Sequence, residues 1–250
     1  MKRLFFTLSL LICFQLLKAQ PESLSQLEEK AYYAYLNSNM SLWKMLAPKA
    51  DKLLDFPSDN QEEHIRAIKL KYGLLYACLA SKEKDEATFN EYIGKTSDQI
   101  STLLKLYPNS PELLSVSAAI MSVQMAFSPA KAIILSSKSG KQISKALEID
   151  STCALAWRQD ASSKYFTPKM WGGDVELAVK EYEKAVRLFE ALNPAKEWMY
   201  LDAMAWLGIA YAQLGLNDKA KDIYEKALLL EPDFWWVKRG LLPGLSKSSN

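Results

Sequence analysis

Residues 136–142 come closer than any other segment to a catalytic motif, the phosphate-binding loop. Their sequence, Ser-Ser-Lys-Ser-Gly-Lys-Gln, contains the Gly-Lys pair of that loop. The motif requires a glycine where Leu135 stands and a serine or threonine where Gln142 stands, and the sequence predicts no strand before it. We therefore expect a helix whose small side chains permit close packing, and no nucleotide site.

His64 is the single histidine of the chain. The sequence around it, Glu62-Glu63-His64, lacks the second histidine of a zinc-binding helix, and one histidine supplies neither a structural metal site nor a convincing catalytic triad. We expect His64 to be exposed at the start of a helix. No metal ligand and no cofactor is predicted.

Thiols and carboxylates are the remaining groups that could carry chemistry. Cys78 and Cys153 lie in apolar helical stretches without a visible general base, which favours two separate buried thiols over a nucleophile or a disulfide. Acidic residues such as Glu181 and Glu183 stand beside lysines and are expected on solvated helix faces. We therefore predict no catalytic residue, and an unrecognised hydrolase is the least favoured hypothesis.

Residues 1–19 have the features of a cleaved signal peptide. Lys2 precedes an apolar run of 14 residues at 4–17, and Ala19 is a small residue where signal peptidase could cut. As a helix the run would be about 21 Å long, short of the roughly 30 Å hydrocarbon core, so an uncleaved anchor is the minor alternative. We expect the protein to be periplasmic or secreted, and without a membrane span after cleavage.

The charges of the remaining chain are balanced. Removal of Lys2, Arg3 and Lys18 reduces the 31 basic residues to 28, against 29 acidic residues, none of which lies in 1–19. Binding to nucleic acid requires a clustered basic surplus on the protein. The composition therefore argues against nucleic acid as the main partner.

Apolar side chains recur at helical spacing along the whole chain. One stripe runs along the segment 175–189 at positions i, i+3, i+4, i+7, i+11 and i+14: Val175, Ala178, Val179, Tyr182, Val186 and Phe189. Breakers such as Asn193-Pro194 and Glu231-Pro232 separate such stripes. We predict an all-α protein with about 10–11 helices: 22–37, 40–55, 60–81, 84–106, 111–127, 129–149, 152–166, 174–192, 195–214, 217–230 and 233–240.

The segment 201–234 resembles the tetratricopeptide repeat. It carries the family's L-G-x2-Y…A-x3-F…P pattern at the right spacing, with a methionine, Met204, where the family usually has tryptophan: Leu207, Gly208, Tyr211, Ala220, Tyr224 and Pro232. Gly208 and Ala220 would be small where the paired helices cross, and the two tyrosines would fill the wedge between them. Looser copies, with spacings of about 40 residues, extend the resemblance over 100–240.

The resemblance implies a right-handed superhelical solenoid of antiparallel helix hairpins. Degenerate hairpins would form residues 20–100, and residues 101–250 would hold the repeats and a C-terminal capping helix. The first helices of such repeats line a concave face that binds a protein or peptide. In this chain the resemblance places there Arg158, Ser162, Tyr165, Asp202, Ala205, Ile209 and Gln213.

The turn at residues 167–174 also resembles a Gly-Gly-Asp turn found in exported bacterial repeat proteins. In one interpretation it is an extended turn in which Gly172 and Gly173 supply positive φ, Asp174 caps the next helix and Trp171 packs into the hairpin. In the other, Lys169, Trp171 and Asp174 contact a small molecule or a glycan. This second interpretation is the alternative to a protein or peptide partner.

Phe234-Trp235-Trp236 open the last predicted helix. Neighbouring side chains on a helix point about 100° apart, so Trp235 and Trp236 cannot both enter one core. We expect one of them to close the end of the solenoid and the other to be partly exposed, where it could contact a partner.

Overall fold

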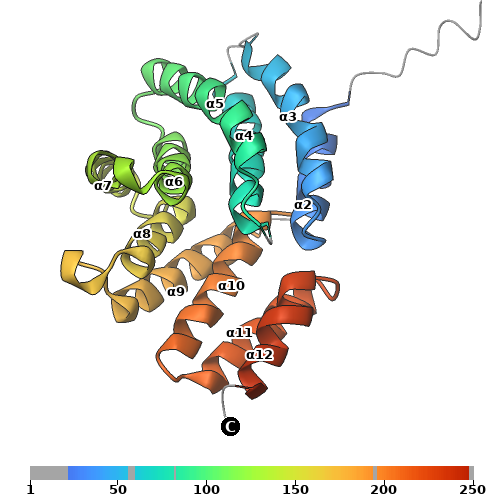
Figure 1. The fold of residues 1–250 in the computed structure, drawn as a ribbon, viewed down its shortest axis with the longest axis vertical. Coiled ribbons are helices and arrows are strands. Elements are labelled where there is room, and N and C mark those ends of the chain that lie inside the picture. Colours follow the sequence, from blue (N-terminus) through green and yellow to red (C-terminus); the bar gives the residue numbers. More distant parts are fainter. Residues whose placement is uncertain (1–21, 56–59, 82, 194–195, 248–250) are drawn as a thin grey trace, which may run out of the picture.

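The structure is a computed structural model that describes residues 22–55, 60–81, 83–193 and 196–247 (Figure 1). The predicted signal peptide at residues 1–19 lies outside this part of the chain. The described part contains eleven α-helices and no strand: α2 (Leu24–Leu36), α3 (Met40–Asp55), α4 (Gln61–Ala80), α5 (Glu86–Leu106), α6 (Pro111–Phe127), α7 (Ala132–Ile149), α8 (Ala154–Phe166), α9 (Val175–Leu192), α10 (Trp198–Gln213), α11 (Asn217–Leu230) and α12 (Leu242–Lys247). The predicted all-α fold is confirmed.

Side-chain caps explain why the helices begin where they do. Ser23, Asn60, Asp85, Ser110 and Asp174 each accept a hydrogen bond from a backbone amide two or three residues further on. Each cap therefore satisfies an amide that would have no partner in the first turn. These capping residues are visible in the sequence, and the observed helix starts lie close to the predicted ones.

The C-terminal helix differs from the prediction of 233–240. Helical structure begins at Trp235, passes through the π-helical turn η3 (Val237–Leu241) and continues through α12 to Lys247. Pro243 has no amide hydrogen and would disrupt a regular α-helix at this point. In the π-turn the Leu242 amide bonds to the Val237 carbonyl, and this wider turn accommodates the proline within the helix.

Consecutive helices pack as antiparallel pairs that follow one another around an arc (Figure 1). Two of the strongest pairs are α8 with α9 and α10 with α11. The arc brings the first described helix, α2, into contact with α10. The chain is an all-α solenoid, and no helix in its described part is long and apolar enough to cross a membrane.

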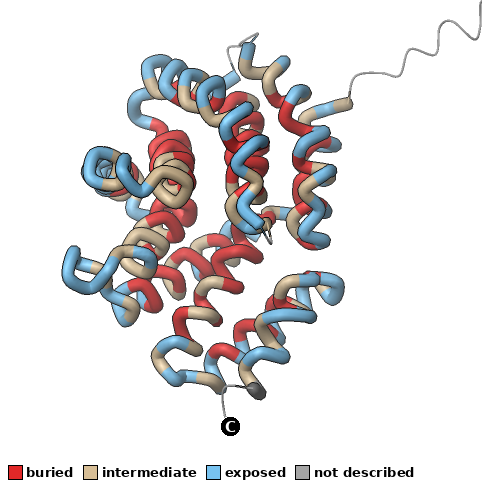
Figure 2. Tube along the Cα trace, viewed as in Figure 1, coloured by how far each residue is buried: buried red, intermediate tan, exposed pale blue. Residues whose placement is uncertain are grey.

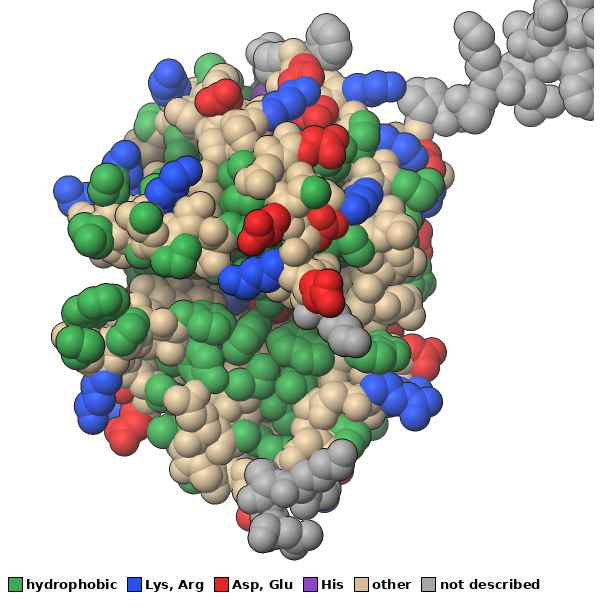
Figure 3. All heavy atoms as spheres, viewed as in Figure 1, with side chains coloured by type: hydrophobic (Ala, Val, Ile, Leu, Met, Phe, Trp, Pro, Cys, Tyr) green, Lys and Arg blue, Asp and Glu red, His purple; other side chains and the backbone are tan. Residues whose placement is uncertain are grey.

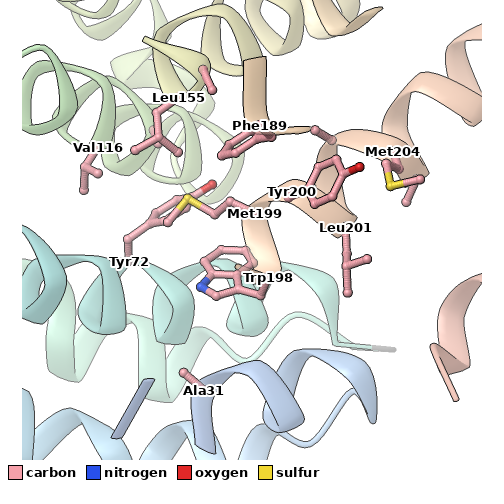
Figure 4. Close-up of a cluster of buried hydrophobic side chains, with 14 of the residues drawn as sticks. Ala31, Tyr72, Val116, Leu155, Phe189, Trp198, Met199, Tyr200, Leu201 and Met204 are labelled. Carbon is pink, nitrogen blue, oxygen red and sulfur yellow. The ribbon is translucent and has the colours of Figure 1, made fainter. Parts of the chain in front are cut away.

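Buried residues lie on the inward faces of helices α2 to α11 (Figure 2). The centre of the core is the N-terminal half of α10. There Trp198 and Met199 lie near Tyr72 of α4, Val116 of α6 and Leu155 of α8 (Figure 4). Helix α10 is thus the element against which N-terminal and C-terminal helices both pack.

The α10–α11 pair has the close crossing that the sequence predicts. A Cβ atom at Gly208 would lie 2.1 Å from Cε1 of Tyr224, so any larger residue would collide with the ring. Tyr224 is fully buried, and Met204, at the unusual position of the pattern, is buried as well. The proposed register of residues 201–234 therefore agrees with the packing.

Candidate binding surface

Three residues predicted to line the concave groove lie in the core. Arg158, Asp202 and Ala205 are buried, so the prediction that they contact a partner is wrong. Arg158 of α8 donates through Nε to Oδ2 of Asp202 over 3.0 Å, and its Nη2 contacts the same oxygen. The groove face of a typical repeat is covered here because the chain curves until α2 and α4 reach α10.

Tyrosines from the N-terminal helices complete this buried network. The hydroxyls of Tyr35 and Tyr76 donate to Oδ1 of Asp202 over 2.9 and 2.7 Å. Burial, followed by the nearby Asp202 charge, raises the pKa of both tyrosines well above the ordinary value, so both remain donors. Burial alone would lower the pKa of Arg158, but the Asp202 carboxylate outweighs it and the pKa is raised. Arg158 therefore stays charged in the core.

The network reaches the surface through Trp206. Its Nε1 donates to the hydroxyl of Tyr76 over 2.9 Å, which fixes the direction of the indole. Trp206 is half-buried and stands among three other rings, with centroid distances of 4.8 Å to Phe166, 5.6 Å to Tyr165 and 5.7 Å to Trp236. We call these four residues the aromatic surface.

The aromatic surface is open to solvent. Phe166, the last residue of α8, is 61% exposed, although its ring packs edge-on against Trp206 at 74°. Figure 3 shows a recess across the molecule, and below it a broad hydrophobic area over the C-terminal helices. Apolar rings held in place but left accessible form a surface suited to binding.

The other predicted groove residues have mixed positions. Tyr165 belongs to the aromatic surface, and Ile209 on α10 is half-buried. Ser162 is half-buried too, with its Oγ 2.8 Å from the Tyr182 hydroxyl. Gln213 is exposed at the end of α10. A role in binding remains a prediction for these four residues.

The turn at residues 167–174 combines features of both interpretations. Gly172 has φ of 92° and Asp174 accepts from the Leu177 amide, as the extended turn requires. Gly173 does not have positive φ; it is needed because a Cβ there would lie 1.7 Å from the Thr167 carbonyl oxygen. Trp171 is 74% exposed, so the expectation that it packs into the hairpin is wrong. Lys169 is exposed as well.

At the C-terminal end the two adjacent tryptophans divide as expected. Trp236 packs edge-on against Trp206, whereas Trp235 is about half exposed. Phe234 is fully buried beneath them and lies against Tyr35 of α2, with ring centroids 5.5 Å apart. The tail of the chain thus closes one side of the aromatic surface.

His64 is buried, which corrects the expectation of an exposed residue. It lies on the same stripe of α4 as Ala67, Ile68 and Lys71, a pattern visible in the sequence. Its Nδ1 is 3.3 Å from the Tyr107 hydroxyl, and its Nε2 has no hydrogen-bond partner among the described residues. The described part of the chain holds no group of acidic, cysteine or histidine side chains suited to a metal ion.

Glu181 is also buried, contrary to the expectation of a solvated helix face. Only 7% of it is exposed, its charge interacts with that of Asp160 on α8, and its Oε2 has no hydrogen-bond partner among the described residues. Burial, and then the charge of Asp160, raises the pKa of Glu181 to about 7. Burial raises the pKa of Asp160 too, despite Lys164 at 3.8 Å. Burial thus favours the protonated form of both carboxyl groups.

The other groups considered from the sequence have structural positions. Cys78 and Cys153 are separate, buried and free, as predicted. Burial raises the pKa of Cys153 to about 11, so this thiol is a poor nucleophile. Residues 136–142 lie inside α7, where the buried Ser139 faces α6 and donates to the Ala118 carbonyl oxygen over 3.4 Å. The expected helix is confirmed, but of its small residues only Ser139 packs closely, since Ser136, Ser137 and Gly140 are exposed.

A second hollow, of about 690 Å³, lies between α2, α4 and the start of α10. Its charged walls are neutralised within the protein. Arg66 pairs with Glu28, with Nε 2.8 Å from Oε1, and Lys69 pairs with Glu197. These ion pairs join the N-terminal helices to α10, so this hollow offers few free polar groups.

Sequence reasoning missed the central member of the aromatic surface. Trp206 stands on a different face of α10 from the residues of the repeat pattern, and only the packing of Tyr76 beneath it gives it a role. Phe166 was missed because it ends a helix. A search for aromatic residues that fall outside the repeat pattern would have found both.

Comparisons with known proteins agree with the architecture. The family model of the tetratricopeptide repeat matches residues 201–234. The HusA haemophore from Porphyromonas gingivalis is similar in structure, with a TM-score of 0.60 at 16% sequence identity over 78% of this chain and 96% of that chain. No curated protein matches the sequence. The chain therefore contains a tetratricopeptide repeat at residues 201–234, set within an all-α solenoid.

Proposed function

We propose that this protein is a non-catalytic binding protein that takes an apolar ligand on the aromatic surface. The observation that carries the proposal is a partly exposed group of rings whose central member, Trp206, is anchored by hydrogen bonds to the buried Tyr76–Asp202 network. A surface fixed in this way loses little conformational entropy on binding. Tryptophan and tyrosine are also the residue types that dominate binding energy at interfaces.

The partner that fits this surface best is a protein or peptide segment with apolar side chains. Figure 3 shows a broad hydrophobic area below the recess, and an apolar surface of this kind suits an amphipathic helix. Ile209 and Gln213 extend the surface along α10 and would contact such a segment. We place the protein in the periplasm or outside the cell, on the basis of the predicted signal peptide.

A second candidate ligand is a flat aromatic molecule such as haem. Two observations favour it: Trp171 and Met170 are strongly exposed in the turn that follows Phe166, and a structurally similar protein is a haemophore. At 16% identity that similarity concerns the fold alone, so the ligand has to be tested directly. Trp171 could stack on a flat ring, and Met170 offers a sulfur ligand to iron.

The test uses the chain without residues 1–19 as bait in envelope extracts. Phe166→Ser should abolish capture of the specific partner, because it removes the most exposed ring of the aromatic surface. Leu229→Ser is the matched control, since Leu229 is also apolar and exposed but lies on α11. Equal capture by the wild-type protein and both variants would overturn the proposal for a protein partner.

Haem is tested by titration followed by its absorbance. If haem is the ligand, Trp171→Ala and Phe166→Ser should each weaken binding at least about tenfold, while Leu229→Ser should not. Base or ring stacking on one aromatic side chain is worth about 1–3 kcal/mol, which corresponds to this factor. Binding that is unchanged in all three variants would reject the surface as a haem site.

A further inference from the structure

The outward face of α7, together with the turn before it, carries four lysines, and the one acidic residue of α7 is Glu148 near its C-terminal end. Residues 113–147 contain no aspartate or glutamate. Within this segment all four lysines are exposed: Lys131, Lys138, Lys141 and Lys145. A charge-balanced chain thus concentrates positive charge on one helix.

The four lysines form a stripe. Their separations of 7, 3 and 4 residues place them within an arc of about 80° at about 100° per residue. The opposite face of α7, with Ser139, Ile143 and Ala146, is buried. The stripe therefore points away from the protein.

Lysines elsewhere in the protein commonly pair with carboxylates, as Lys49 does with Glu22 and Lys95 with Asp55. In the described part of the chain none of the four lysines of α7 forms an ion pair; Lys145 donates to the Pro108 carbonyl oxygen over 2.7 Å. Figure 3 shows lysine or arginine side chains together with hydrophobic ones over the region of α7, at the left edge of the molecule. Four lysines against the single glutamate Glu148 leave this face with a net positive charge.

Two isoleucines accompany the stripe. Ile133 is 87% exposed and Ile134 is 63% exposed, and both lie in the first turn of α7. Ile134 falls inside the arc of the lysines. One exposed apolar residue needs no explanation, but two adjacent large ones at the end of a basic stripe form the pattern of an interfacial helix face.

We propose that this face of α7 docks the protein on an anionic lipid surface. The lysines would bind lipid headgroups, each contributing about fivefold to the affinity. The isoleucines would enter the boundary between headgroups and acyl chains. A soluble polyanion would attract the same lysines but would not bury Ile133 or Ile134, and this difference decides between the two.

The experiment measures sedimentation of the chain without residues 1–19 with vesicles. One set is phosphatidylcholine alone, and the other contains about a third phosphatidylglycerol. The wild-type protein should bind the anionic set only, and added salt should weaken binding because it screens the charges. Lys138→Glu with Lys141→Glu should reduce the affinity at least about 25-fold. Lys105→Glu with Lys180→Glu changes the net charge equally on exposed positions of α5 and α9 and should have little effect.

A third variant separates lipid from polyanion. Ile133→Ser with Ile134→Ser should weaken binding to anionic vesicles while leaving binding to heparin unchanged. Failure of the wild-type protein to bind anionic vesicles, equal losses in both lysine pairs, or no effect of the isoleucine change would each overturn the proposal. Phe166→Ser should leave vesicle binding intact, so this test is independent of the aromatic surface.

Discussion

Replacement of Asp202 by asparagine should destabilise the protein severely. The change is nearly isosteric, but it removes the negative charge that Arg158 faces and substitutes an amide donor for one acceptor oxygen. Arg158, Tyr35 and Tyr76 all donate to this carboxylate, and it is fully buried. Breaking a buried ion pair by removal of one partner costs about 3–5 kcal/mol. Since a domain is stable by about 5–15 kcal/mol, Asp202→Asn should remove much of the margin.

Removing both charges should cost less than removing one. In Arg158→Met with Asp202→Leu no charge is left buried, and the remaining penalty is the loss of an acceptor for Tyr35 and Tyr76, at about 1–3 kcal/mol each. The double-mutant cycle should therefore give a coupling energy of at least about 1.5 kcal/mol in favour of the pair. This sign distinguishes a charged pair from two independent packing residues.

The assay is urea unfolding followed by far-ultraviolet circular dichroism, extrapolated linearly to water. The slope with urea should stay constant across the variants, because the surface exposed on unfolding is similar. A loss below about 1 kcal/mol for Asp202→Asn, or additive losses in the cycle, would refute the buried charged network.

Two further predictions concern the repeat packing and the buried carboxyl pair. Gly208→Ala should lower the free energy of unfolding by about 1–3 kcal/mol, because the new Cβ meets the ring of Tyr224. Gly94→Ala, with open space around it in α5, should raise it by about 0.5–1 kcal/mol. Equal effects of the two changes would disprove the close crossing. Burial raises the pKa of Glu181 to about 7, above its ordinary value of 4.5, so its stabilising contribution is complete below about pH 4.5 and is lost as the pH rises through 7. Between pH 5 and pH 8 the free energy of unfolding of the wild-type protein should fall by about 2 kcal/mol. Glu181→Gln should abolish this fall, whereas Glu176→Gln, at an exposed position, should retain it. The same pH dependence in both variants would contradict the shifted pKa.

The binding surface could be anticipated only in part. Tyr165 was predicted as a groove residue and lies on the aromatic surface, but Arg158 and Asp202, predicted beside it, are buried. The resemblance to the tetratricopeptide repeat assigns positions within one repeat. It does not predict which other helices of the chain pack against each face of that repeat. Here α2 and α4 cover the positions of Arg158 and Asp202, which would otherwise be open.

His64 and Glu181 illustrate a similar limit. Polar residues are usually exposed, so both were expected at the surface. His64 nevertheless shares the buried stripe of α4, and Glu181 reaches Asp160 on a neighbouring helix. For His64 the sequence already contained the relevant signal, because its position on the apolar stripe of α4 decides its burial more strongly than its polar side chain does. For Glu181 no sequence pattern reveals that a second carboxyl group lies opposite.

Local properties of the chain were determined by the sequence itself. Helix positions follow from apolar spacing and from caps such as Ser23 and Asp174, because these act between residues a few positions apart. The crossing at Gly208 follows from the repeat pattern for the same reason. The tertiary structure alone decided that Tyr35 and Tyr76 reach Asp202, more than 120 positions away in the sequence. Which face of a helix remains open depends on where distant helices pack, and no local pattern contains that information.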